Sequence, residues 1–153
     1  MKINADFYEN LGVIGEANNR HKEALDYYKK SLKIKFSMYG DKNDEVLDLQ
    51  YKISSVYLLL KQYKECEQVL VSLTDVISEE KLKNSSIDSY YRYGCYYYTL
   101  GIAYMKNNKI NNAKIAFKKV MRMWEAILPV SDPAVISINN LYQICEDKMK
   151  SNI

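Results

Sequence analysis

The chain has 153 residues, 48% of them hydrophobic and 27% charged, which is the make-up of one soluble globular domain with a core of its own. Its 22 basic and 19 acidic residues leave a net charge of +3, too balanced to favour nucleic acid or an anionic membrane as a partner. No apolar run approaches the roughly 18–20 residues of a membrane span. The N-terminus lacks the apolar core of a signal peptide, so we expect a cytoplasmic protein.

Apolar residues recur at helical spacing almost throughout, and turn-forming residues separate the helices. Gly40 suits the left-handed end of one helix, and Asn43 suits the N-cap of the next. Ser85 predicts a capping box with the acidic residue three positions on, and Asp132-Pro133 predicts a further helix start. Shorter breaks fall at 18–19, 61–62 and 107–108. These signals predict about seven helices joined by short turns and no strand.

Three stretches of the chain align with one another. They are anchored on a small residue in each second helix, namely Ala24, Cys66 and Ala113, at spacings of 42 and 47 residues. A fourth start, DPAVISINNLYQICED from Asp132, has no partner helix. Repeats of this length predict stacked supersecondary units, because a single unit cannot bury its own apolar face.

The aligned copies share an aromatic residue, a Leu-Gly pair or its equivalent, a tyrosine, a small residue, a large apolar residue and a second small residue. The third copy supplies Tyr97, Leu100, Gly101, Tyr104, Ala113, Phe117 and Val120. The first supplies Tyr8, Leu11, Gly12, Ala24, Tyr28 and Ser31, with Gly15 where the tyrosine is usual. The second is more degenerate, with Ile53, Ser54, Tyr57, Cys66, Leu70 and Leu73. This pattern resembles the tetratricopeptide repeat (TPR).

The resemblance implies an all-α, right-handed TPR-like α-solenoid of about seven antiparallel helices, with three helix pairs and a C-terminal single helix. We expect one TPR-like domain over 1–153, with repeats at about 5–40, 44–80 and 86–128 and a terminal helix at 132–149. The 42-residue spacing and the wording DPAVISINNLYQI resemble the repeats of kinesin light chains. The chain departs from that subtype in its degenerate second repeat and in a five-residue insertion before the third.

In this family the first helix of each repeat lines a concave groove, and one stripe of that helix faces the ligand. The resemblance places a peptide-binding groove at Glu9, Val13, Glu16, Tyr51, Ser55, Leu58, Tyr98, Ile102, Met105, Asn139 and Gln143. Such a groove would be acidic at its N-terminal end and apolar-aromatic in the middle, suited to a peptide with apolar anchors. Cations are missing from the positions that clamp a peptide carboxylate in some relatives, so we expect no such clamp. The carboxylates could equally form a solvated face.

The tyrosine-rich stretch YYRYGCYYYTL at 90–100 divides in this frame between two faces. The core or inter-repeat face receives Tyr90, Tyr93, Tyr97 and Tyr104. The groove face receives Tyr91, Cys95, Tyr98, Ile102 and Met105. Tyr96 is expected on a flank. Met121, Met123 and Trp124 are at core spacing, and part of that face could meet a partner because Trp124 lies near the C-terminal end.

No catalytic or cofactor-binding pattern is present: His21 stands alone, the three cysteines have no metal or redox spacing, and no Gly-rich phosphate loop occurs. We therefore expect no cofactor, no bound metal and no enzyme activity. The favoured function is a protein-interaction module, an adaptor or scaffold, that binds a peptide in its groove or docks into a larger assembly. The alternative is a regulatory TPR protein that senses a short signalling peptide. The N-terminal end carries no capping helix, so self-association or docking through that end is also expected.

Overall fold

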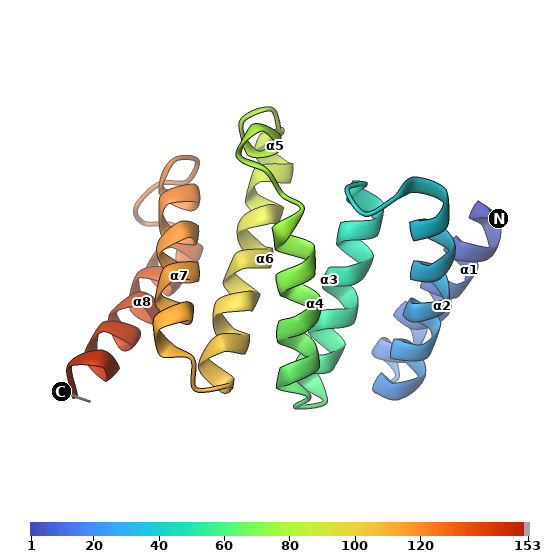
Figure 1. The fold of residues 1–153 in the computed structure, drawn as a ribbon, viewed down its shortest axis with the longest axis horizontal. Coiled ribbons are helices and arrows are strands. Elements are labelled where there is room, and N and C mark those ends of the chain that lie inside the picture. The colour runs from blue at the N-terminus through green and yellow to red at the C-terminus, as the bar shows by residue number, and fades with distance from the viewer. Residues whose placement is uncertain (152–153) are drawn as a thin grey trace. The chain divides into compact units, whose positions relative to one another are not determined.

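A computed structural model describes residues 1–151, and all of the regular secondary structure within them is helical (Figure 1). The chain divides into two compact units, Met1–Val76 and Ile77–Ile153. The first unit holds α1 (Lys2–Ala17), α2 (His21–Tyr39), α3 (Asp44–Leu59) and α4 (Tyr63–Asp75). The second holds α5 (Glu79–Lys83), α6 (Ile87–Lys106), α7 (Ile110–Glu125) and α8 (Pro133–Ser151). The short α5 is the addition to the seven helices expected, and it occupies the insertion before the third repeat.

Three helix pairs are closed by turns of the same kind. Asn19, Lys61 and Asn108 have φ angles of 59°, 59° and 61° and mark the three turns within repeats. In each turn the next backbone N–H donates to the carbonyl five residues earlier, from Arg20 to Gly15 at 2.8 Å, Gln62 to Tyr57 at 2.9 Å and Lys109 to Tyr104 at 2.8 Å. The predicted breaks are confirmed, and the shared left-handed residue shows that the three helix pairs are joined by turns of the same conformation.

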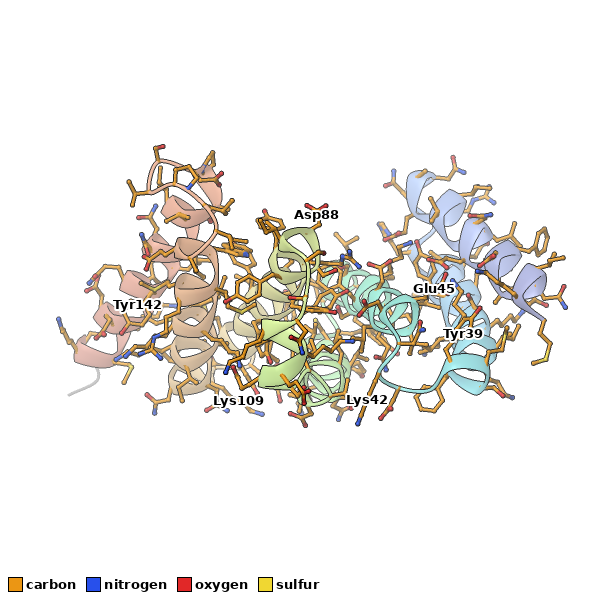
Figure 2. All side chains as sticks on the ribbon, turned by 90° about the horizontal axis from the view of Figure 1, so that it is seen from above. Tyr39, Lys42, Glu45, Asp88, Lys109 and Tyr142 are labelled. Carbon is orange, nitrogen blue, oxygen red and sulfur yellow. The ribbon has the colours of Figure 1, made fainter. Side chains whose placement is uncertain are left out.

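Between α2 and α3, the first helix ends and the second begins where the sequence predicts (Figure 2). Gly40 follows the last residue of α2 with a φ of 81°, a backbone conformation that glycine adopts without steric cost. Asn43 caps α3, because its side-chain oxygen accepts a hydrogen bond from the N–H of Glu45 at 2.9 Å. Figure 2 labels Tyr39, Lys42 and Glu45 along this connection.

The start of α6 differs from the prediction by one residue. Ser86, rather than Ser85, caps the helix by accepting a hydrogen bond from the N–H three residues on at 3.2 Å. Ser85 instead donates its hydroxyl to the carbonyl of Leu82 at 2.7 Å, which ties it to the end of α5. The start of α8 is as predicted, since Asp132 accepts from the N–H two residues on at 2.8 Å and Pro133 opens the helix.

Glycines let the two helices of the first and third repeats approach closely. A Cβ on Gly12 would overlap the ring of Tyr28, and a Cβ on Gly101 would overlap the ring of Phe117. Both rings are fully buried. In the second repeat a larger Ser54 and a smaller Leu70 take these positions, and both are 0% exposed. Small residues on the first helix thus allow the two helices of each repeat to pack closely.

Candidate functional site

Glu9 on α1 connects three helices of the first unit through two lysines. Its carboxylate accepts hydrogen bonds from Nζ of Lys35 on α2 at 2.6 Å and from Nζ of Lys52 on α3 at 2.7 Å. Lys35 also pairs with Asp6 at 3.3 Å, and Lys52 pairs with Asp48 at 3.9 Å. The Lys35 side chain is 4% exposed and that of Glu9 16%, so this central pair is largely removed from solvent, whereas Asp6, Lys52 and Asp48 at the edge of this ionic cluster are 33–45% exposed. Its charges nearly balance, with three carboxylates against two ammonium groups.

Ion pairing outweighs burial in this cluster. Burial raises the pKa of Glu9, but the hydrogen bonds from Lys35 and Lys52 lower it by more, so its pKa lies below the usual range. Burial lowers the pKa of Lys35, but the bonds to Glu9 and Asp6 raise it by more. Both groups are therefore charged at neutral pH, and Glu9 is engaged in holding α1, α2 and α3 together.

Of the two remaining predicted positions on α1, Glu16 forms a hydrogen bond within the chain and Val13 is exposed. Glu16 accepts a hydrogen bond from the phenol of Tyr28, and burial together with that carboxylate raises the pKa of the phenol. Val13 is 45% exposed. The N-terminal end of the predicted groove thus carries acidic residues, as expected, but Glu9 and Glu16 are already bound within the chain.

The predicted positions on α3 leave a partly apolar surface. Leu58 and Tyr51 are half-buried, and Ser55 donates its hydroxyl to the carbonyl of Tyr51 at 3.1 Å. Because Lys52 of α3 reaches Glu9 of α1, the first-helix faces of the first two repeats meet at the ionic cluster. Of the six predicted residues of the first unit, only Glu9 belongs to the ionic cluster.

In the second unit an aromatic stack takes the corresponding place. The indole of Trp124 on α7 lies between two tyrosine rings of α6, with its centroid 5.2 Å from Tyr91 and 5.7 Å from Tyr98. The interplanar angles are 15° and 26°. Nε1 of Trp124 donates to the carbonyl of Tyr91 at 3.3 Å. Gly94 lies beneath the indole, and a Cβ there would overlap Nε1. Stacking, a hydrogen bond and a close backbone approach fix this ring.

Tyr98 also extends the site toward α8. Its ring is tilted against Phe117 at 6.2 Å, and its hydroxyl lies 3.3 Å from that of Ser137 on α8. Ile102 and Met105, the next predicted positions on α6, are half-buried. The predicted α8 residues are exposed, namely Asn139 and Gln143.

Polar contacts attach the middle of α8 to α7. Lys114 pairs with Glu146 at 3.0 Å, and its Nζ lies 5.7 Å from the ring of Tyr142, which Figure 2 labels. The amide of Gln143 donates to Asp147 at 2.9 Å. The side of α8 that these contacts hold is therefore fixed against α7, while Gln143 stays on the solvent side.

The ionic cluster and the aromatic stack occupy the same position in their repeats. Lys35 lies eleven residues after the anchor Ala24, and Trp124 lies eleven residues after the anchor Ala113. Each contacts the first-helix residue at the predicted groove position, Glu9 or Tyr98. One packing position thus carries a cation against carboxylates in the first repeat and an indole between phenols in the third.

The sequence interpretation missed this position and misplaced one aromatic residue. Trp124 is 3% exposed, as its core spacing indicates, and the two tyrosines cover the face that was expected to be open to a partner. Tyr96 is 0% exposed, rather than lying on a flank. The sequence did carry a signal for the packing of Trp124. Gly94 and Gly101 are seven residues apart on one helix, and Trp124 and Phe117, which pack on them, are seven residues apart on the next. Tyr93 is 2% exposed, as expected of a core position.

The titratable side chains described do not form a metal site. Within residues 1–151 no three His, Cys, Asp or Glu side chains gather in an arrangement that could hold a metal ion. Burial, with a smaller effect from Glu67, raises the pKa of the Cys66 thiol to about 12. None of the helices described there is long and apolar enough to cross a bilayer.

Comparison with known proteins identifies the repeats. The family model described as tetratricopeptide repeat matches residues 5–37 and 96–123, which are the first repeat and most of the third. No curated protein sequence matches the chain significantly.

Solved structures with the same fold cover nearly the whole chain. The TPR-like repeats of a putative kinesin light chain from Podosopora anserina align with a TM-score of 0.76 at 14% identity, over 96% of this chain and 67% of that one. BtubC (BKLC) from P. vanneervenii aligns at 0.71 and 14% identity, over 96% and 62%. The first TPR of Spaghetti bound to an HSP90 peptide aligns at 0.69 and 15% identity, over 98% and 96%. Two stretches of the chain therefore match the tetratricopeptide repeat model, and its predicted all-α, TPR-like solenoid fold is confirmed.

Proposed function

We propose that this TPR chain is a protein-interaction module that binds a peptide segment of a partner along the first-helix faces of its repeats. The observation that supports it most is the aromatic stack of α6 and α7. Tyr91 is 38% exposed and Tyr98 is half-buried, so both leave part of their surface accessible while Trp124 holds them in place. Rigid tyrosines contribute contact area at low entropic cost.

The half-buried Ile102 and Met105 continue this surface along α6. An apolar or aromatic peptide side chain would lie against them and against Tyr98, and its backbone would reach the hydroxyl groups of Tyr98 and Ser137. The first TPR of Spaghetti holds an HSP90 peptide, so this fold accommodates such a ligand in that protein. Here Lys35 and Lys52 are paired with Glu9, which argues for apolar anchoring rather than capture of a peptide carboxylate.

A peptide array with an intrinsic fluorescence readout tests this proposal. Trp124 is the only tryptophan, so a peptide that contacts Tyr91 or Tyr98 is expected to change its emission. Peptides selected on the array should bind at least about tenfold more weakly to Ile102→Gln combined with Met105→Gln. The control is Ile115→Gln on α7, a 71% exposed side chain away from this face. Equal binding to the double variant and to the wild type would refute the assignment of the surface.

A regulatory peptide sensor is the alternative form of this function. A sensor would change its dimensions when the peptide binds, whereas an adaptor would not. Small-angle X-ray scattering with and without a selected peptide separates the two. An unchanged radius of gyration at saturation favours the adaptor.

Exposed apolar residues on α1 support a second proposed function, self-association through the N-terminal end. Ile3, Phe7 and Ile14 are 83%, 59% and 55% exposed and lie along one side of the helix. Such a stripe can pair with the same stripe of a second copy. Light scattering after size exclusion should show a dimer that Phe7→Gln dissociates. A strict monomer at high concentration would contradict this proposal.

A further inference from the structure

A pocket of about 420 Å³ lies in the second unit, on a surface separate from the first-helix positions described above. It is lined by Glu79 and Leu82 of α5, Tyr90 of α6, and Ile115, Lys118, Lys119, Arg122 and Met123 of α7. None of these eight residues belongs to the aromatic stack. The pocket is therefore a distinct feature that the proposed peptide surface does not use.

The insertion before the third repeat builds one wall of this pocket. Ser78 caps α5 by accepting a hydrogen bond from the N–H of Lys81 at 3.0 Å. Leu82 is 6% exposed, and Lys81 places its Nζ 5.9 Å from the ring of Tyr93 on α6. These contacts hold a helix of only one turn and a half against the longer helices, so the wall is fixed rather than a loose loop.

The lining combines an apolar side with a cationic rim. Leu82, Tyr90 and Met123 supply apolar and aromatic surface. Lys118 and Arg122 are exposed, stand four residues apart on α7, and so share one face of the helix. Within the part of the chain that the structure describes, neither forms an ion pair with a carboxylate. Two uncompensated cations beside apolar surface favour a ligand that is both anionic and apolar.

The chain itself shows how such a ligand meets this surface. Glu79 of α5 pairs with Lys119 at 3.1 Å, while Leu82, three residues on, is buried against the pocket. The segment of α5 thus already pairs an acidic side chain with a lysine of α7 and, beside it, buries a leucine among apolar neighbours. A second acidic-apolar segment would repeat this arrangement on Lys118 and Arg122, which Glu79 leaves free.

We propose that this pocket binds a short acidic segment of a partner protein, with one apolar side chain in the pocket and carboxylates on Lys118 and Arg122. The apolar lining argues for a peptide over a free phosphate, which would leave that lining unused. Ile115, 71% exposed, extends the apolar surface at the rim and would be covered by the segment. This is a second binding site, and it stands whether or not the first-helix surface binds a peptide.

Fluorescence anisotropy with a defined probe tests the site. The probe is a fluorescein-labelled peptide of sequence Gly-Asp-Glu-Leu-Asp-Glu-Gly, and the comparison probe replaces its leucine by glycine. Reversing both cations, in Lys118→Glu combined with Arg122→Glu, is expected to weaken binding at least about tenfold. The matched control, Lys33→Glu combined with Lys64→Glu, makes the same change in net charge on exposed residues of α2 and α4 and should leave affinity within about twofold.

Location and selectivity provide the outcomes that would overturn the proposal. Amide chemical shifts in a ¹⁵N-labelled sample should move at residues of α5 and at Lys118 and Arg122 of α7. Equal loss of binding in the pocket variant and its matched control would show attraction by net charge alone. Equal binding of the glycine probe, or displacement of the probe by single-stranded DNA at the same concentration as by unlabelled peptide, would show a general polyanion surface. The Ile102→Gln and Met105→Gln variant should bind this probe normally, so the two sites can fail independently.

Discussion

Adding one methyl group at Gly94 tests the aromatic stack directly. In the structure a Cβ at this position would overlap Nε1 of Trp124 and lie 3.0 Å from its Cδ1 atom. The indole is a rigid ring held between Tyr91 and Tyr98, so it has to leave the stack to make room. We expect Gly94→Ala to expel Trp124 from its position.

The expected loss of stability follows from opposing contributions. Glycine to alanine in a helix interior stabilises by about 1 kcal/mol. Overpacking costs about 1–3 kcal/mol. Loss of the hydrogen bond from Trp124 to Tyr91 costs about 1 kcal/mol, and loss of the two ring contacts costs about 1 kcal/mol more. The sum predicts a net destabilisation of about 3 kcal/mol, or roughly 6–12 °C in the midpoint of thermal unfolding for a chain of this size.

Circular dichroism measures the midpoint, and fluorescence reports the fate of the only tryptophan. Emission should shift to longer wavelength in Gly94→Ala, because the indole gains solvent. In a Trp124→Leu background the same substitution should instead raise the midpoint, since a flexible smaller side chain removes the overlap and leaves the helix-propensity gain. A Gly94→Ala protein more stable than wild type, with unchanged emission, would refute the account of the stack.

Three further substitutions or treatments test other features. Glu9→Gln should destabilise by about 2 kcal/mol at pH 7, since it removes a charged partner from the nearly buried Lys35. The pKa of Glu9 is lowered by folding, so this contribution is present above the unfolded value near 4.5 and is lost as pH falls through the folded value. Urea unfolding curves of variant and wild type should therefore converge in acid, and a constant difference down to pH 2 would contradict the ion-pair assignment. Lys61→Asn should stabilise by about 0.5 kcal/mol, because φ is 59° and asparagine tolerates that conformation better; calorimetry showing a lower midpoint would exclude this relief. Thiol titration at pH 8 should leave the buried Cys66 and Cys145 unreacted until denaturant is added, and rapid native labelling of both would show that the core opens readily.

The helices and the repeat frame could be predicted from the sequence because their signals are local. Turn residues such as Gly40 and Asn43 act within a few positions of themselves. The small residues Gly12 and Ala24 recur with their large partners at fixed spacing, so one copy explains the others. The one-residue error at the start of α6 arose because Ser85 and Ser86 are both suitable caps. Contact with α5 decided between them.

The state of the predicted groove residues was decided by the tertiary structure. Whether Glu9 is a free carboxylate or an ion-pair partner depends on Lys35 and Lys52, which lie 26 and 43 residues away in the chain. Whether Trp124 is exposed depends on a backbone contact with Tyr91 across 33 residues. Such partners meet only after the helices pack, and no local spacing specifies them. The sequence by itself determined where the helices and their anchors lie. Packing decided which side chains remain available to a ligand, because burial and pairing depend on neighbours that are distant in the chain.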